Sequence, residues 1–206
     1  MGFLLLQYEY QRASREVSVH ERAGIRLDDQ VDRYTKRIEN MQSVFDKAQD
    51  RLTKNWDRKS QLFSAEISKA TCYSANGLSA INDFNALING IVIGGIRLSA
   101  YVQASTAGLS SSPSAQDIMA VLSNYTAQAK SVMSSLIEDA KEADLLRLQA
   151  QQSEQLDPIS EKEKDLEAKQ NLENTLCEVW TTRRDNAKQR LGQDIGNSMA
   201  SFGLKG

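Results

Sequence analysis

The sequence predicts an all-α protein in which long N- and C-terminal helices pair as a coiled coil, with a neutral middle segment and a further helix between them. Only two of the 206 residues are proline, so long uninterrupted helices are permitted. The charged regions are dominated by Glu, Lys, Arg, Gln, Leu and Ala, which are good helix formers. Apolar residues in these regions recur at alternating steps of three and four, which is the rhythm of a heptad repeat.

Residues 1–72 are expected to form one long N-terminal coiled-coil helix. The stripe continues beyond residue 52 through Trp56, Phe63, Ile67 and Ala70, after a four-residue step that is typical of a local change of supercoil. Two members of the stripe, His20 and Gly24, are poor core residues and predict a loosened seam or a bend. The stripe consists of Phe3, Leu6, Tyr10, Ala13, Val17, His20, Gly24, Leu27, Val31, Tyr34, Ile38, Met41, Phe45, Ala48 and Leu52.

The apolar start of this helix predicts neither a secretory signal nor a membrane anchor. It contains only the four apolar residues Phe3 to Leu6 in succession. A signal sequence needs an apolar stretch of about 7–15 residues, and a membrane span needs about 20. We therefore interpret this stretch as the first turns of the long helix.

Residues 73–116 are expected to form a low-charge, apolar middle segment rich in Gly and Ser. Helical spacing holds to about Ile88, but IVIGGIRL also matches two β-branched runs joined by Gly-Gly, which is a hairpin signal. Residues 89–105 are therefore either helix or hairpin. A stretch that is this apolar must be covered, either because it folds back onto the core of the same chain or because a neighbouring subunit contacts it.

A further helix is predicted over residues 117–156. Ser114 or Asp117 is its candidate N-terminal cap, because short polar side chains accept hydrogen bonds from the free N–H groups of a first turn. Its small residues allow a neighbouring helix to approach closely. Its stripe consists of Ile118, Leu122, Tyr125, Ala129, Val132, Leu136, Ala140 and Ala143.

A separate C-terminal helix is predicted over residues 157–206. Asp157 before Pro158 fits a cap followed by a first-turn proline, and the acidic residues that come next suit the positive end of a helix. The helix ends in small and apolar residues. Its stripe consists of Ile159, Leu166, Leu172, Leu176, Val179 or Trp180, Ala187, Leu191, Ile195, Met199 and Phe202.

Charge and cysteine content exclude several classes of partner. The net charge of -2 gives no general attraction to phosphate backbones, so nucleic acid is not an expected partner. The basic and acidic residues within residues 9–22 cancel, so contact with a membrane surface is not expected either. Cys72 and Cys177 lie too far apart for a zinc-knuckle spacing, and they are interpreted as two part-buried thiols, with a disulfide as the alternative.

Enzymatic chemistry is not expected, because the necessary residues are scarce. His20 is the single histidine, and its place on the apolar stripe indicates a packed or interfacial residue rather than a catalytic base. A carboxylate-bridged metal site would need two Glu-x-x-His repeats. No glycine-rich phosphate-binding loop is present. The sequence therefore predicts no enzyme, no cofactor and no metal site.

Both ends of the sequence carry apolar helical material, which a helical polymer buries through repeated contacts between copies. The chain itself is thus the expected partner. The residues expected at this assembly interface are Phe3, Leu6, Tyr10, Leu27, Val31, Tyr34, Ile38, Met41, Phe45, Leu52, Leu191, Ile195, Met199 and Phe202.

Two stretches, FLLLQYEYQRASREVSVHERAG and SMASFGLKG, resemble the opening and the end of the filament subunits of type III secretion systems, which are related in design to flagellins. The resemblance implies terminal helices that pair to build a filament wall, a homopolymer, an export chaperone as a partner, and an extracellular or cell-surface location reached without a cleaved leader. The apolar helix begins at Phe3, where that family has a polar leader, so another kind of assembly stays open.

The expected function is therefore that of a structural, self-assembling subunit of a secretion-related helical filament. One alternative is a soluble coiled-coil scaffold or virion-type structural protein, with a cytoplasmic location. The other is a membrane-surface coiled-coil remodelling protein.

Overall fold

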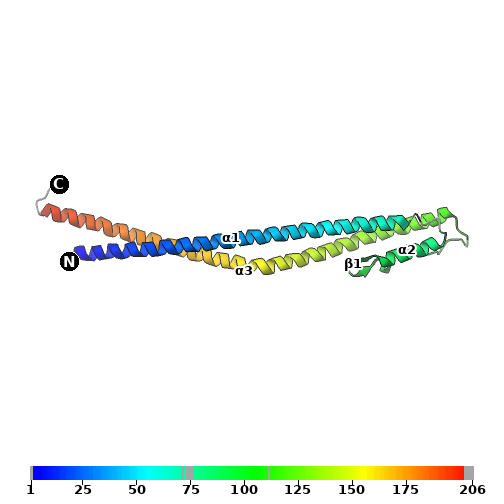
Figure 1. The fold of residues 1–206 in the computed structure, drawn as a ribbon, viewed down its shortest axis with the longest axis horizontal. Coiled ribbons are helices and arrows are strands. Elements are labelled where there is room, and N and C mark those ends of the chain that lie inside the picture. Colours follow the sequence, from blue (N-terminus) through cyan, green and yellow to red (C-terminus); the bar gives the residue numbers. More distant parts are fainter. Residues whose placement is uncertain (1, 71, 73–76, 111, 202–206) are drawn as a thin grey trace. The chain divides into compact units, whose positions relative to one another are not determined.

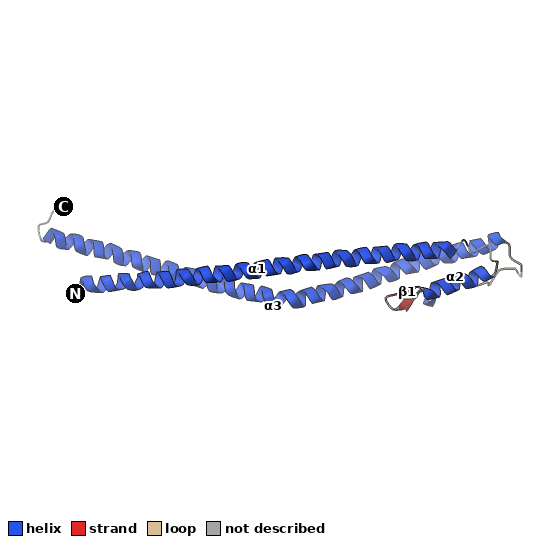
Figure 2. Cartoon of the chain, in the orientation of Figure 1, coloured by secondary structure: helices blue, strands red, loops and turns tan. Residues whose placement is uncertain are grey.

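The computed structural model describes residues 2–70, 72, 77–110 and 112–201. The α-helices among them are α1 (Gly2–Lys69), α2 (Ser79–Gly90) and α3 (Ala115–Ser201) (Figure 1). Between α2 and α3 lie two short strands, β1 (Val92–Ile93) and β2 (Ile96–Arg97), and the 3-10 helix η2 (Leu98–Ala100) (Figure 2). The predicted all-α class is confirmed.

The chain divides into two compact units. Unit 1 consists of Met1–Gln42 and Glu154–Gly206, and unit 2 is the continuous segment Ser43–Ser153. In each unit a segment of α1 packs on a segment of α3, and the two run in opposite directions. In unit 1, for example, His20 contacts Glu173 while Thr35 contacts Glu163. The predicted pairing of the long helices is confirmed.

The predicted stripe of α1 is its packed face. Every stripe residue from Leu6 to Leu52 is buried or half-buried, and only Phe3 is exposed. Beyond the four-residue step, Trp56 and Ile67 are buried as well. The helix passes through His20 and Gly24 without interruption, and it ends at Lys69 rather than at residue 72.

The predicted restart of the chain at Asp157 and Pro158 is wrong. The helix α3 continues from Ala115 to Ser201 with Pro158 inside it. Proline has no N–H to offer the carbonyl one turn earlier, which costs about 3 kcal/mol in a helix interior. Here the flanking sequence consists largely of strong helix formers, and apolar residues on both sides of the proline pack against α1 in their own units. These contributions offset the lost hydrogen bond.

The register predicted for the second half of α3 is partly wrong. Leu172 and Val179 are exposed, whereas Trp180 is half-buried, so Trp180 rather than Val179 is the stripe residue. The half-buried Glu173 lies on the packed face beside Leu172. Polar side chains therefore occupy part of the packed face of α3, and the apolar repeat in the sequence is incomplete there.

The first turn of α3 is closed by a capping box. The Asp117 N–H donates to Ser114 Oγ at 3.2 Å, and the Ser114 N–H donates to Asp117 Oδ2 at 3.0 Å. This reciprocal pair satisfies two backbone donors that a helix start would otherwise leave open. Of the two candidate caps, Ser114 is the cap and Asp117 is its partner.

This capping box predicts a pH-dependent helix start. Hydrogen bonds from the side chain and then the backbone of Ser114 hold the pKa of Asp117 below its ordinary value. A lowered folded-state pKa gives stability that is present above the unfolded pKa and lost as the pH falls through the folded pKa. We expect Asp117→Asn to lower the amide protection of residues 115–118 at neutral pH, and to differ little from the wild type in strong acid. A difference that persists unchanged in strong acid would contradict this role.

The middle segment after α2 is a hairpin. β1 and β2 pair antiparallel, with Val92 opposite Arg97 and Ile93 opposite Ile96. Gly94 and Gly95 connect them with φ values of 59° and 86°, which a two-residue hairpin turn of type I′ requires and which residues with a side chain avoid. Of the two alternatives for residues 89–105, the hairpin is therefore correct.

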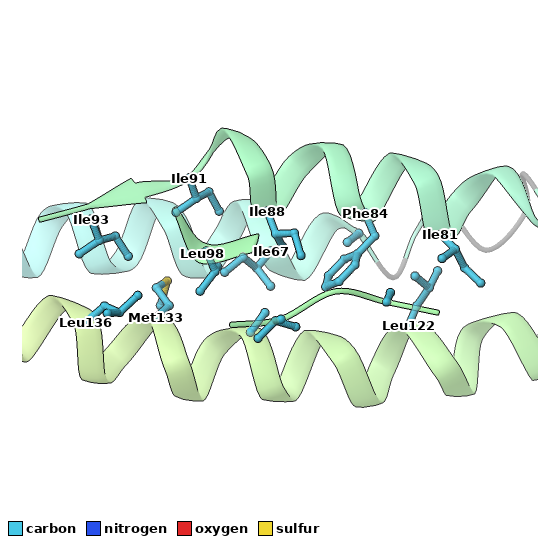
Figure 3. Packing of buried hydrophobic residues seen from close by; sticks show 14 of the residues in the cluster. Ile67, Ile81, Phe84, Ile88, Ile91, Ile93, Leu98, Leu122, Met133 and Leu136 are labelled. Carbon is cyan, nitrogen blue, oxygen red and sulfur yellow. The ribbon is translucent and has the colours of Figure 1, made fainter. Parts of the chain in front are cut away.

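The buried core of unit 2 joins residues of α1, α2, β1, η2 and α3. Ile81, Phe84 and Ile88 of α2 point toward the layer that α3 forms, where Leu122 and Met133 lie (Figure 3). Further members are Ile67, Ile91, Ile93, Leu98, Val102, Ala104, Ile118, Leu136 and Ile137. Of the two alternatives for covering the low-charge middle segment, folding back onto the core of its own chain is the one that the structure shows.

One polar group in this core has no hydrogen-bond partner among the described residues. The side chain of Thr126 is 6% exposed, and its Oγ1 is buried and unpaired. A buried hydroxyl without a partner costs about 1–3 kcal/mol. Because valine has nearly the same shape, we expect Thr126→Val to raise the free energy of unfolding by about 1 kcal/mol in urea titrations. A loss of stability would show that the hydroxyl is satisfied in solution.

Candidate self-association surface

The helix pair of unit 1 has a sparse interior. Its buried apolar side chains among the described residues are those of Ala13, Val17, Leu166 and Ala187, whereas unit 2 buries a cluster that includes Phe84 and Trp56. Eight of the predicted interface residues in unit 1 are half-buried along the seam between α1 and α3: Leu6, Tyr10, Leu27, Val31, Tyr34, Ile38, Met41 and Leu191. Two helices alone therefore leave much of this seam open to contact.

Phe45 and Leu52 continue the predicted interface into unit 2. Both are half-buried, and Leu52 packs against the buried core of unit 2. The α1 members of the predicted interface from Leu6 to Leu52 thus lie on the stripe of α1 that packs within the chain, whereas Phe3 is exposed.

Large apolar side chains are exposed near the start of α1. Phe3 is 46% exposed, Leu4 75%, Leu5 61% and Tyr8 63%. We call these four residues the apolar end patch. On α3, Ile195 is 47% exposed. Met199 lies in α3, but its side chain is not described, and Phe202 falls outside the described residues.

His20 joins the two helices of unit 1 through a side-chain contact with Glu173. Its Nδ1 lies 2.6 Å from Glu173 Oε2, and its Nε2 lies 4.0 Å from Glu16 Oε2 on the same helix. One turn further along α1 lies the buried Gly24. A Cβ added at this position would lie 3.1 Å from Asn174 Oδ1, so the two helices approach closely there. His20 is thus a packed residue that helps to set the register.

Two further polar contacts fix the same register. Thr35 Oγ1 hydrogen-bonds to the Glu163 carboxylate, and Gln170 Nε2 donates to Asp28 Oδ1 at 2.7 Å. Such side-chain contacts are individually weak on an exposed surface, but they are met only at one alignment of the two helices. Specificity of pairing in unit 1 therefore comes largely from polar groups.

A basic cleft lies beside Trp180 in unit 1. It has a volume of about 360 Å³. The guanidinium carbons of Arg12 and Arg183 lie 5.7 Å and 4.8 Å from the centre of the Trp180 ring, within the range of a cation–π interaction. The lining residues, which we call the arginine cleft, are Glu9, Arg12, Ala13, Trp180, Arg183, Asn186, Ala187 and Arg190.

Sequence reasoning did not find this cleft. Its arginines come from two helices that are far apart in sequence, and each arginine alone resembles an ordinary solvated charge. The available signal was Trp180, a large aromatic residue among charged neighbours. From the sequence, Trp180 was predicted only as an alternative to Val179 on the apolar stripe.

Both cysteines are free thiols; Cys177 is half-buried as predicted, whereas the prediction of a part-buried Cys72 is wrong, because Cys72 is exposed. Among the described residues, no three His, Cys, Asp or Glu side chains gather where they could hold a metal ion. No helix within the described part of the chain is both long and apolar enough to cross a membrane.

No protein-family model, curated protein or solved structure matches this chain.

Proposed function

We propose that this protein is a structural subunit that assembles with copies of itself into a helical polymer. The observation that carries the proposal is the incomplete burial of unit 1. Its seam residues are half-buried, and the apolar end patch lies in solvent beside them. A helix pair of this kind gains stability when a further surface covers its open side.

Burial of the apolar end patch contributes favourably to such a contact. Complete burial of an aliphatic or aromatic side chain contributes about 1.5–3 kcal/mol. The four residues of the apolar end patch together offer several kcal/mol before the cost of association. A contact between two different surfaces of the same chain repeats from copy to copy, and it generates a helical fibre when the repeat does not close into a ring.

A secretion-related role and an extracellular location stay predictions of the sequence resemblance. The proposal that rests on structural observation is the narrower one, a homopolymer built from paired helices. Its support is the exposure of Leu4, Leu5 and Tyr8, and the half-buried seam next to them.

The test is assembly of the purified protein, followed by sedimentation velocity and negative-stain electron microscopy. We expect fibres from the wild type. The variant Leu4→Ser/Leu5→Ser/Tyr8→Ser should keep its helix content by circular dichroism but stay largely unassembled.

A matched control removes exposed apolar side chains from unit 2 instead. Val92, Ile96 and Tyr101 are 49%, 41% and 60% exposed, and their replacement by serine should leave assembly as in the wild type. A wild type that stays monomeric at every concentration would refute the proposed function. An end-patch variant that assembles normally would show that another surface carries the contact.

A further inference from the structure

The arginine cleft has an excess of positive charge that the chain itself does not neutralise. Three guanidinium groups, those of Arg12, Arg183 and Arg190, line it together with one carboxylate, that of Glu9. Among the described residues, no carboxylate lies within ion-pairing distance of these guanidinium groups, whereas the neighbouring Arg184 is paired with Asp185 at 3.0 Å. The cleft thus presents unused donors.

The chemistry of the cleft favours carboxylates carried on an apolar scaffold. Guanidinium groups bind carboxylates through two parallel hydrogen bonds, and stacking on an indole ring holds them in place before the partner arrives. Trp180 and the buried Ala13 and Ala187 add an apolar floor. A fitting partner therefore carries acidic groups and an apolar side chain close together.

One exposed stripe of α3 in unit 2 has this composition. Glu138, Glu142 and Leu146 are spaced by four residues and therefore lie in line on one helix face. All three are exposed, with Leu146 58% exposed. We call them the acidic stripe.

The nearby cations are engaged elsewhere. Lys141 pairs with Asp57 at 3.2 Å, and Arg147 lies 3.7 Å from Asp144. Neither glutamate of the acidic stripe has an ion-pair partner among the described residues. The stripe is therefore left with unneutralised negative charge.

Five other acidic pairs have the same four-residue spacing; Asp157–Glu161 and Glu163–Glu167 are followed by Asp165 and Asn171, and the other three end differently. In each of these three, a lysine four residues beyond the second acidic residue supplies a local counter-charge. The acidic stripe has Leu146 at that position instead, so it combines the two acidic groups with an apolar side chain. The three series that end in lysine are Asp28–Asp32–Lys36, Asp46–Asp50–Lys54 and Glu161–Asp165–Lys169.

We infer that the arginine cleft of one copy binds the acidic stripe of a second copy. The inference rests on the proposed self-assembly and names one of its contacts. Cleft and stripe are different surfaces of the same chain, so each copy can bind one neighbour through its cleft and another through its stripe. Because exposed ion pairs are screened by salt, this contact weakens as the ionic strength rises.

Two charge-reversed variants test the contact. The first is Arg183→Glu/Arg190→Glu in the cleft, and the second is Glu138→Lys/Glu142→Lys in the stripe. Each variant alone brings like charges together, so we expect its critical concentration for assembly to rise about tenfold or more. Mixed in equal amounts, the variants restore opposite charges at the contacts between unlike copies, and assembly should return. Circular dichroism confirms that each variant remains helical.

A neutralised pair supplies the matched control. Glu138→Gln/Glu142→Gln should weaken assembly, whereas Glu161→Gln/Asp165→Asn removes the same charges at the same spacing and should have little effect. Equal effects of the two pairs would overturn the inference in favour of a general charge effect.

The remaining outcomes separate this inference from the proposed function. If the wild type and both reversed variants assemble alike, the contact is refuted and self-assembly stands. If only the cleft variant fails, the cleft takes another anionic partner, and the acidic stripe is not its ligand. A mixture that fails to assemble, although each variant is folded, also refutes the contact. A wild type that never assembles refutes both proposals.

Discussion

Replacing Phe84 with alanine is expected to destabilise unit 2 by about 3–5 kcal/mol, which is the usual cost of removing a large aromatic side chain from a packed core. Phe84 is 0% exposed and lies where α2 meets the α1–α3 pair (Figure 3). The loss is a large fraction of the total stability of a domain of this size, about 5–15 kcal/mol. Urea titration followed by circular dichroism measures it.

The control for this change is Tyr101→Ala in the same segment. Tyr101 is also aromatic but is 60% exposed, so its removal should change the free energy of unfolding by no more than about 0.5 kcal/mol. Similar losses at the two positions would mean that α2 and the hairpin do not form the core described here. The middle segment would then be a peripheral module rather than part of the folded unit.

The second large effect is expected from Ile38→Asp/Phe45→Asp. Both side chains are half-buried on the stripe of α1, so the double change removes apolar contacts and places two charges at a packed surface. We expect a loss on the order of 3 kcal/mol together with a lower helix content at moderate temperature. Thermal unfolding and circular dichroism measure both quantities.

The matched control places the same charges on the outer face of the same helix. Ile25 and Val44 are 61% and 63% exposed, and Ile25→Asp/Val44→Asp should cost less than about 1 kcal/mol. If the two double variants are equally stable, the heptad stripe does not hold α1 to its partner helix segments.

The sequence predicted the fold well wherever burial follows a simple period. The α1 stripe was predictable because apolar residues at steps of three and four must lie on one face, and its members from Leu6 to Leu52 are indeed buried or half-buried. The hairpin was one of two open alternatives. Its confirmation depends on the left-handed conformations of Gly94 and Gly95, which the sequence permits but does not require.

The errors arose where local preference and tertiary packing disagree. Pro158 is a strong local signal for a helix start, yet packing on both sides keeps α3 continuous. The exposed Leu172 was assigned to the stripe because it is apolar, whereas the neighbouring Glu173 makes the contact with His20. The arginine cleft could not be predicted, because it depends on which residues of two distant helices lie opposite each other.

The order of the two units along the chain has a consequence for how the protein folds. Unit 2 is continuous in sequence, whereas unit 1 is assembled from Met1–Gln42 and Glu154–Gly206, with all of unit 2 between them. Bringing these two segments together from an unfolded chain means closing a loop of more than a hundred residues, which carries an entropic cost. Once the helices of unit 2 have paired, that loop is already closed, and the pairing of unit 1 can extend along the same two helices. We therefore expect unit 2 to fold first and the helices of unit 1 to pair after it. On unfolding, we expect unit 1 to open before unit 2.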